Sequence, residues 1–170
     1  SGNAAAQYQV AVMASQGAGG PKDEATAALY YKKSLQTWKK EADDGDAKAA
    51  LWAALVYERK LVPDSSPEKS VPYLLQAAES GNLTAQGLLA FKYRDGLGVP
   101  QDAAKAVEWF EKAASRKDLG AVMELGIMFR DGKYLPPDRE KAFHWFEKGA
   151  EWKDPYSMAA LADMLLEGTP

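Results

Sequence analysis

Apolar residues recur in this chain at two spacings, one that fits a helix and one that is much longer. In the unit of residues 83–118, Ala85, Leu89 and Tyr93 lie at i, i+4 and i+8, which is one stripe of a helix. A second stripe, from Ala106 to Ala114, follows a short break. The whole pattern repeats every 36 residues without a gap. A period between about 20 and 50 residues is typical of a solenoid. The chain is therefore predicted to be all-α, built from stacked helix-turn-helix units.

Three sets of equivalent positions define this period. They are Ala42, Ala78, Ala114 and Ala150; Asp46, Asn82, Asp118 and Asp154; and Tyr57, Tyr93, Phe129 and Leu165. One solenoid over residues 4–170 follows, with repeats at about 4–44, 45–80, 81–116 and 117–152 and a half repeat at 153–170. In the first repeat the segment GAGGPKD lengthens the loop by seven residues relative to the later repeats.

Helix start and stop residues sit at the ends of the apolar stripes. Asp95-Gly96 is predicted to end one first helix, because glycine tolerates a left-handed cap, and Asp102 to cap the helix that follows. The second repeat departs from this pattern, since it lacks Asp-Gly and relies on Ser66-Pro67 as cap and first helical residue. It also places Pro72 inside its second helix, so local irregularity is expected there.

Composition narrows the class of partner. The chain has 170 residues, 46% of them hydrophobic, and a formal net charge of -3. Interleaved charges make nucleic acid an improbable partner, and no apolar run of about 18 residues is present to span a membrane. Cysteine is absent, which removes disulfides and thiolate chemistry. Residues 1–3 are interpreted as a cloning remnant or disordered start. A periplasmic or cell-envelope location, with an upstream secretion signal removed, is slightly preferred over a cytoplasmic location.

Two segments carry a family resemblance: FKYRDGLGVPQDAAKAVEWFEKAA and MFRDGKYLPPDREKAFHWFEKGA. Both run in the order aromatic, Asp-Gly, Pro, Asp, Lys-Ala and Trp-Phe, and they resemble the Sel-one-like repeat (SLR) family, a relative of the tetratricopeptide repeats. The resemblance implies a right-handed α/α superhelix whose first helices line a concave binding face. It also implies roles as adaptors, scaffolds or bacterial immunity partners. The cysteine pairs common in secreted members are missing here.

If the first helices face inward, the residues beside the packing stripe form a groove for a partner. The larger side chains at these positions are Leu51, Trp52, Val56, Leu88, Lys92, Met123, Glu124, Met128 and Met164, with Tyr8, Gln9 and Met13 in the first repeat. Methionine and tryptophan are frequent at adaptable protein-binding surfaces. The alternative for Leu51, Val56 and Met164 is packing against the inner wall of a tight superhelix.

Charged and aromatic residues near the helix ends are candidates for a rim around the groove. These are Glu58, Arg59, Arg94 and Arg130, together with Trp152 in an inter-repeat loop. The charged side chains would bind a partner's carboxylates, or else form local ion pairs of small net value. Trp152 is either a loop plug or part of a contact. By contrast, Trp109, Phe110, Trp145 and Phe146 are predicted to pack between repeats.

Catalytic signatures are weak. His144 is the single histidine, and its equivalents Pro72 and Glu108 mark a tolerant surface position. The run Asp43-Asp44-Gly45-Asp46 lacks the later glutamate of a calcium loop and is interpreted as an inter-repeat turn. No cofactor and no metal are predicted. The chain is interpreted as a non-enzymatic module that binds a protein or peptide, with an immunity or scaffold role for a secreted effector or complex as the specific form. The alternative is a small-ligand or cell-wall-fragment binder with hydrolytic activity.

Overall fold

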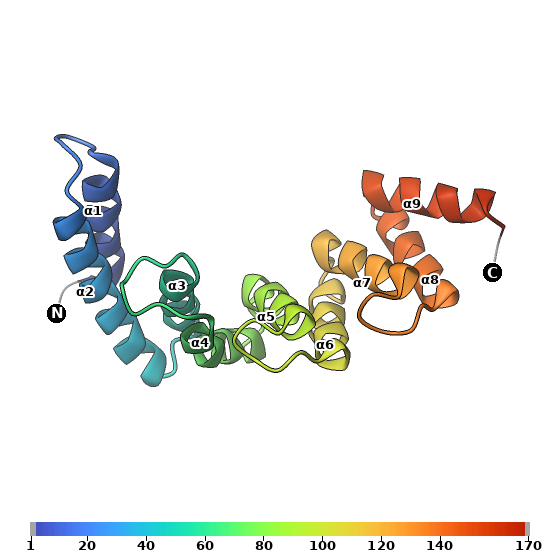
Figure 1. Cartoon of the computed structure of the whole chain (residues 1–170), viewed down its shortest axis with the longest axis horizontal. Coiled ribbons are helices and arrows are strands. Elements are labelled where there is room, and N and C mark those ends of the chain that lie inside the picture. Colours follow the sequence, from blue (N-terminus) through green and yellow to red (C-terminus); the bar gives the residue numbers. More distant parts are fainter. Residues whose placement is uncertain (1–2, 169–170) are drawn as a thin grey trace. The chain divides into compact units, whose positions relative to one another are not determined.

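The computed structural model describes residues 3–168, and within this range it contains nine helices and no strand (Figure 1). The remnant predicted at residues 1–3 falls mostly on Ser1 and Gly2, which lie outside the described residues. The helices are α1 (Ala4–Gln16), α2 (Glu24–Asp43), α3 (Ala47–Glu58), α4 (Pro67–Glu79), α5 (Leu83–Asp95), α6 (Ala103–Ala114), α7 (Leu119–Asp131), α8 (Arg139–Glu151) and α9 (Pro155–Leu166). The prediction of an all-helical repeat array is confirmed.

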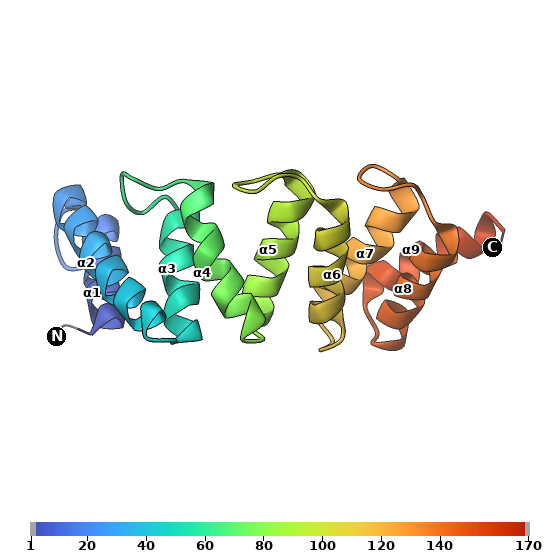
Figure 2. The ribbon, with the colours of Figure 1, turned by 90° about the horizontal axis from the view of Figure 1, so that it is seen from below.

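The chain forms two compact units, Ser1–Ala85 and Gln86–Pro170. Unit 1 holds α1 to α4, and unit 2 holds most of α5 and all of α6 to α9. In each unit consecutive helices pack side by side, as α1 does on α2, α3 on α4 and α7 on α8 (Figure 2).

The backbone turns left-handed at two fixed positions of the repeat. The first position follows the first helix and is occupied by Gly17, Lys60, Gly96, Gly132 and Gly168. The second lies between repeats and is occupied by Gly45, Gly81, Lys117 and Lys153. All nine residues have a positive φ, from 53° at Lys60 to 105° at Gly168. The second repeat thus keeps the turn geometry of the others although it lacks their glycine.

Polar caps begin most of the helices, as the sequence predicts. Asp102 accepts a hydrogen bond from the Lys105 amide at 3.0 Å, and side chains at seven other helix starts act in the same way: Asn3, Asp23, Asp46, Asn82, Asp118, Asp138 and Asp154. Such a cap typically contributes about 1 kcal/mol. The amides of Asp102 and Asp138 also donate to the carbonyls of Tyr93 and Phe129 at 2.8 Å. These bonds tie α6 to the end of α5 and α8 to the end of α7.

The second repeat is more regular than its sequence predicts. Ser66 precedes α4 but makes no side-chain cap bond, whereas Pro67 opens the helix as expected. The irregularity expected at Pro72 is wrong, because α4 runs unbroken through it. The Pro72 ring is exposed, while Leu74 and Ala77 are buried against α3. This packing holds the helix together despite the backbone hydrogen bond that proline cannot donate.

Small residues in the first helices make room for large ones in the second. Gly126 of α7 lies directly over the ring of Phe146 of α8, which is fully buried. Phe110 and Trp109 of α6 are also buried, in line with the structural role predicted for them. Trp145 is only half-buried, with the Lys148 ammonium 4.7 Å from its ring centre.

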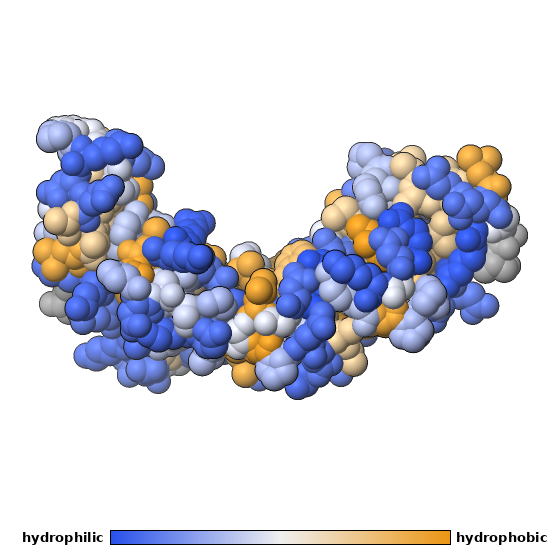
Figure 3. Space-filling model, viewed as in Figure 1, coloured by the Kyte–Doolittle hydropathy of each residue, from blue (hydrophilic) through white to orange (hydrophobic). Residues whose placement is uncertain are grey.

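Helix α9 exposes apolar residues at positions that other repeats bury. Met158 is 53% exposed, whereas its equivalent Val122 is buried. Leu165 and Leu166 are exposed as well, and hydrophobic patches interrupt the otherwise hydrophilic surface of both units (Figure 3). In α9, the first helix of the half repeat, no second helix among the described residues covers this face.

Candidate functional site

Four aromatic side chains gather in unit 1, contributed by three helices. Tyr8 of α1 lies 5.4 Å from Tyr31 and 5.5 Å from Trp38, both of α2, measured between ring centres. Trp52 of α3 stacks on Trp38 at 5.4 Å with an interplanar angle of 15°, and lies 5.7 Å from Tyr8. Aromatic pairs in this range contribute about 0.5–1.5 kcal/mol beyond the area they bury. The cluster is therefore both a core for α1, α2 and α3 and a rigid aromatic wall.

A cavity of about 520 Å³ opens beside this wall. The residues that line it are Asn3, Ala4, Ala5, Tyr8, Gln9, Thr37, Trp38, Glu41, Asp46, Lys48, Ala49 and Trp52. We call this cavity the aromatic pocket. Its size is within the range of about 300–1,000 Å³ common for ligand sites, and it combines aromatic faces with a few polar groups. Trp38 is buried, whereas Trp52 and Tyr8 are half-buried, so these two rings remain accessible in part.

Glu41 breaks the repeat pattern at the edge of the aromatic pocket. Its equivalents 36, 72 and 108 residues later are Ala77, Ala113 and Gly149, all small and buried. In the first repeat this position carries a half-buried carboxylate instead. Glu41 is therefore a departure from the repeat pattern that packing of the later repeats does not require.

Hydrogen bonds fix the polar surroundings of the aromatic pocket. Asp46 accepts from the amides of Lys48 and Ala49 at 2.8 and 3.0 Å and so caps α3. Arg59 donates to the Tyr8 hydroxyl at 3.0 Å, which links the end of α3 to α1. Tyr8, which is predicted for the groove, and Arg59, which is predicted for the rim, are therefore in direct contact.

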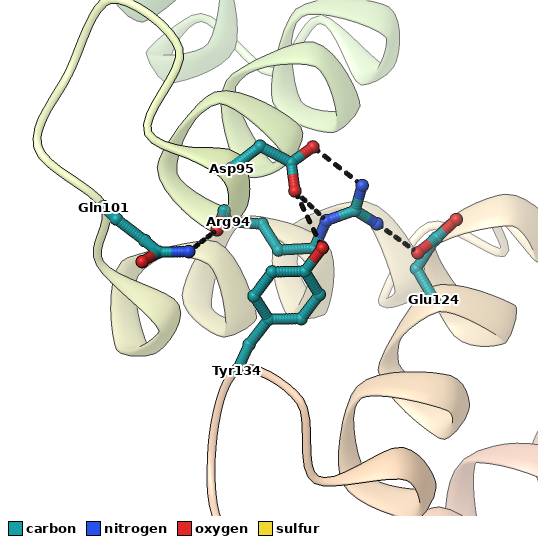
Figure 4. A network of polar contacts seen from close by, with 5 residues as sticks. All are labelled: Arg94, Asp95, Gln101, Glu124 and Tyr134. Carbon is teal, nitrogen blue, oxygen red and sulfur yellow. Dashed lines mark hydrogen bonds and ion pairs between the residues drawn. The ribbon is translucent and has the colours of Figure 1, made fainter.

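A second polar cluster lies in unit 2 around Arg94 (Figure 4). The guanidinium donates to both oxygens of Asp95, at 2.9 and 2.8 Å, and to Glu124 of α7 at 2.7 Å. Tyr134 donates to Asp95 at 3.0 Å, and Gln101 donates to the Arg94 carbonyl at 2.8 Å. The Arg94 guanidinium also lies 4.7 Å from the ring centre of Phe91.

The pKa values of the two carboxyl groups move in opposite directions. The Arg94 hydrogen bonds hold the pKa of Asp95 below its ordinary value, and the Tyr134 hydroxyl adds to this. Burial raises the pKa of Glu124, and the attraction of Arg94 offsets only part of this effect. Arg94 thus favours the ionised form of both carboxyl groups, and for the pKa of Glu124 the effect of burial outweighs it. The cluster joins α5 to α7, and Arg94 takes the second of the two roles predicted for the rim charges, that of a local ion pair.

Four residues predicted for the groove are buried, so their assignment to a partner-binding surface needs correction. For Val56, packing inside the array is the alternative given above. Val56 is fully buried, Met128 is 2% exposed and Lys92 is 4% exposed. The Lys92 ammonium points toward the Leu97 carbonyl at 3.4 Å. Met164, for which packing was the alternative, is also buried. In this conformation these side chains stabilise the helix array and offer no surface to a partner.

The other predicted residues keep some exposure. Gln9, Met13, Arg59 and Arg130 are exposed, and Tyr8, Leu51, Trp52, Glu58, Leu88, Arg94, Met123, Glu124 and Trp152 are half-buried. Arg130 pairs with its neighbour Asp131 at 2.6 Å. Trp152 ends α8 and has the Lys117 ammonium 6.0 Å from its ring centre, so it contacts the preceding inter-repeat turn. A continuous groove along the first helices of the whole chain stays a prediction.

The structure brings together Tyr8, Gln9 and Trp52 of the predicted set and adds residues that sequence reasoning missed. The missed ones are Asn3, Thr37, Trp38, Glu41, Asp46 and Lys48. Trp38 shares its repeat position with Leu74, Phe110 and Phe146 and so resembles a core residue. The detectable signal was Glu41, because a charged residue replaces a small one at a strongly patterned position.

The described residues contain no group of three or more His, Asp or Glu side chains arranged to hold a metal ion. Likewise, no helix in the range 3–168 has the length and apolar character needed to cross a membrane. What the aromatic pocket offers chemically is recognition: stacking on indole and phenol rings with carboxylate, amide and ammonium groups at the rim.

Helix pairs that repeat every 36 residues and stack on their neighbours define a helical-repeat protein. The Sel1 repeat model matches residues 4–36, 47–82, 84–118, 120–151 and 155–170, and the chain belongs to this family. Sel1 repeat proteins are in general protein-interaction modules and in general not enzymes.

Solved structures agree with this placement. A Sel1 repeat protein from Oxalobacter formigenes is 26% identical, with a TM-score of 0.75 over 99% of this chain and 67% of its own. A protein described as a protective antigen present in uropathogenic Escherichia coli strains, displaying an SLR fold, is 28% identical with a TM-score of 0.73 over 97% of this chain. This chain spans 34% of that protein's length. Cysteine rich protein B of Helicobacter pylori, 22% identical over 82% of this chain and all of its own with a TM-score of 0.58, shares the fold. No curated protein sequence matches at a significant level.

Proposed function

We propose that this chain is a non-enzymatic adaptor that binds a segment of another protein in the aromatic pocket of unit 1. The observation that carries the proposal is the open cavity beside Tyr8, Trp38 and Trp52. Tryptophan and tyrosine are the residue types that most often dominate binding energy at protein interfaces. The lining also includes the exposed residues Gln9 and Lys48, which offer polar groups to a partner.

The specific form of this proposal is a role in the bacterial cell envelope, either as an immunity partner or as a scaffold for a secreted effector or complex. It is supported by the bacterial origin of the similar proteins, among them the Escherichia coli protein described as a protective antigen. The alternative, a hydrolytic binder of small ligands, has the cavity volume in its favour. It is the weaker candidate, because Asp46 already caps α3 and leaves Glu41 as the one carboxylate without a structural task in the pocket.

The test compares how much partner is captured by the wild-type chain and by a Trp52→Ala variant. Extracts of the source organism are incubated with each immobilised chain, and captured proteins are quantified by mass spectrometry. We expect at least one specific partner whose capture falls by about tenfold or more with Trp52→Ala, since a central aromatic anchor typically contributes about 2 kcal/mol or more.

Trp152→Ala is the matched control, because Trp152 is also half-buried but belongs to unit 2 and does not line the aromatic pocket. Circular dichroism melting curves establish that both variants fold. If Trp152→Ala removes the partner and Trp52→Ala does not, the binding surface lies on the inter-repeat turns, and the proposal is wrong.

A further inference from the structure

We infer that the aromatic pocket receives a cationic side chain of the partner, an arginine in preference to a lysine. This inference deepens the proposed function and rests on it. It starts from the charged groups that line the cavity, which are the carboxylates of Glu41 and Asp46 and the ammonium of Lys48. The carboxylates outnumber the ammonium, so the pocket side chains carry a net negative charge.

Glu41 is the group expected to bind the cation. No side chain among the described residues pairs with its carboxylate, whereas Asp46 already accepts two backbone amides of α3. Arg59 is nearby but donates to the Tyr8 hydroxyl, and it does not line the cavity. A half-buried carboxylate beside aromatic rings gains most from a cation that brings its own donors, because the pairing is charge-assisted and partly shielded from water.

The aromatic wall adds a second attraction for a cation. The rings of Trp52 and Tyr8 are half-buried, and Trp38 stacks behind Trp52 and holds its ring in place. A cation within about 6 Å of such a ring centre is attracted to the π-system, with tryptophan the strongest partner. The planar guanidinium of arginine can stack on an indole and donate sideways to a carboxylate at the same time, which an ammonium cannot do.

The repeat pattern supports the same occupant. Glu41 stands where the later repeats have a small buried residue, and it places a negative charge in the lining of the pocket. A site built only to bind an apolar side chain would not need this charge, and burying a carboxylate against an apolar group would weaken binding.

The experiment is a titration of the full chain, labelled with nitrogen-15, with the tripeptide acetyl-Gly-Arg-Gly-amide. The same tripeptide with citrulline, which keeps the shape of arginine and removes its charge, is the matched probe, and the lysine tripeptide is the third. Signals are followed in amide and indole N–H correlation spectra, where the Trp52 indole peak is identified by its loss in Trp52→Leu.

We expect saturable shifts of the Trp52 indole and of amides around Glu41 with the arginine peptide. Citrulline should bind at least about fivefold more weakly, and lysine should fall between the two. Glu41→Gln should weaken arginine binding by a similar factor, whereas Glu24→Gln, an exposed change at the start of the same helix, should not.

Equal binding of the arginine and citrulline peptides, shifts located elsewhere, or no shift at millimolar peptide would each overturn the inference. These outcomes are separate from those of the capture experiment. If Trp52→Ala still loses the protein partner while the peptides show no preference for charge, the pocket binds a partner through a neutral group, and only the cationic occupant is wrong.

Discussion

The contact between Gly126 and Phe146 gives the sharpest test of how the repeats pack. A methyl group added at Gly126 would lie 2.7 Å from the ring atoms Cδ1 and Cζ of Phe146, and closer still to Cε1. Favourable carbon contacts lie at about 3.5–4.0 Å, so the ring would have to move by about 1 Å. Phe146 is fully buried and has no solvent to move into. Gly126→Ala is therefore expected to overpack the interface between α7 and α8.

Two effects of opposite sign decide the magnitude of this change. Alanine gains about 1 kcal/mol over glycine inside a helix. Overpacking a filled core typically costs about 1–3 kcal/mol. We expect a net loss of about 1 kcal/mol in the free energy of unfolding, which lowers the melting temperature by roughly 2–4 °C for a chain of this size. Urea unfolding followed by circular dichroism measures the free energy, and a thermal scan measures the melting temperature.

Gly87→Ala is the matched control. Gly87 also lies inside a helix of unit 2, and a methyl group there would meet no atom within 4 Å. This variant should gain up to about 1 kcal/mol from helix propensity alone. A second check pairs Gly126→Ala with Phe146→Leu, which recreates the Ala54 and Leu74 combination of the second repeat and should cost less than the two single changes added together. If Gly126→Ala stabilised the chain as much as Gly87→Ala, the packing argument would be wrong.

Three other changes test features of the turns and polar clusters. Lys153→Gly should raise the free energy of unfolding by roughly 1 kcal/mol, because Lys153 has a φ of 63°, and urea titration would contradict this by showing a loss. Asp95→Asn should lower the free energy of unfolding at neutral pH. The difference from wild type should shrink as the pH falls below 3.8, the ordinary pKa of aspartate, and through the lower pKa that Asp95 has in the folded chain. A difference that stays constant down to acid unfolding would count against the pairing with Arg94. Arg139→Met should speed amide hydrogen exchange at the end of α9, because the Arg139 guanidinium donates to the Met164 and Gly168 carbonyls at 2.7 and 2.6 Å. Unchanged exchange would show that these hydrogen bonds do not stabilise the helix end.

The periodic part of the fold was predictable because its causes are local and repeated. Glycine or a cap residue at a fixed position determines where each helix begins and ends, and the sequence shows these residues directly. The failure at Pro72 has a tertiary cause: buried contacts of α4 on α3 keep the helix intact where propensity alone would break it. Lys60 likewise adopts a left-handed turn that a sequence without glycine does not announce.

The site was predictable only in part, because counting along a helix gives a direction but not a depth. Trp52 and Tyr8 are half-buried residues of first helices, and their rings meet across α1 and α3, while their role in partner binding stays a prediction. Val56 and Met128 share a repeat position on first helices, yet neighbouring helices cover both of them. Whether such a position is open depends on the size and tilt of the next helix, which one sequence does not reveal. Glu41 departs from the repeat pattern in the sequence, but the sequence alone assigns it no role.

The left-handed turn between repeats has a consequence for how this chain can change over generations. Unit 1 has glycine at this turn in both copies, Gly45 and Gly81, whereas unit 2 has Lys117 and Lys153 with the same sign of φ. The backbone is thus held by the helices on either side, and a lysine is accepted at a strain of roughly 1–2 kcal/mol. Each such exchange adds a positive charge to the turn without moving a helix. The surface charge of the turn can therefore differ between repeats while the packed core stays the same.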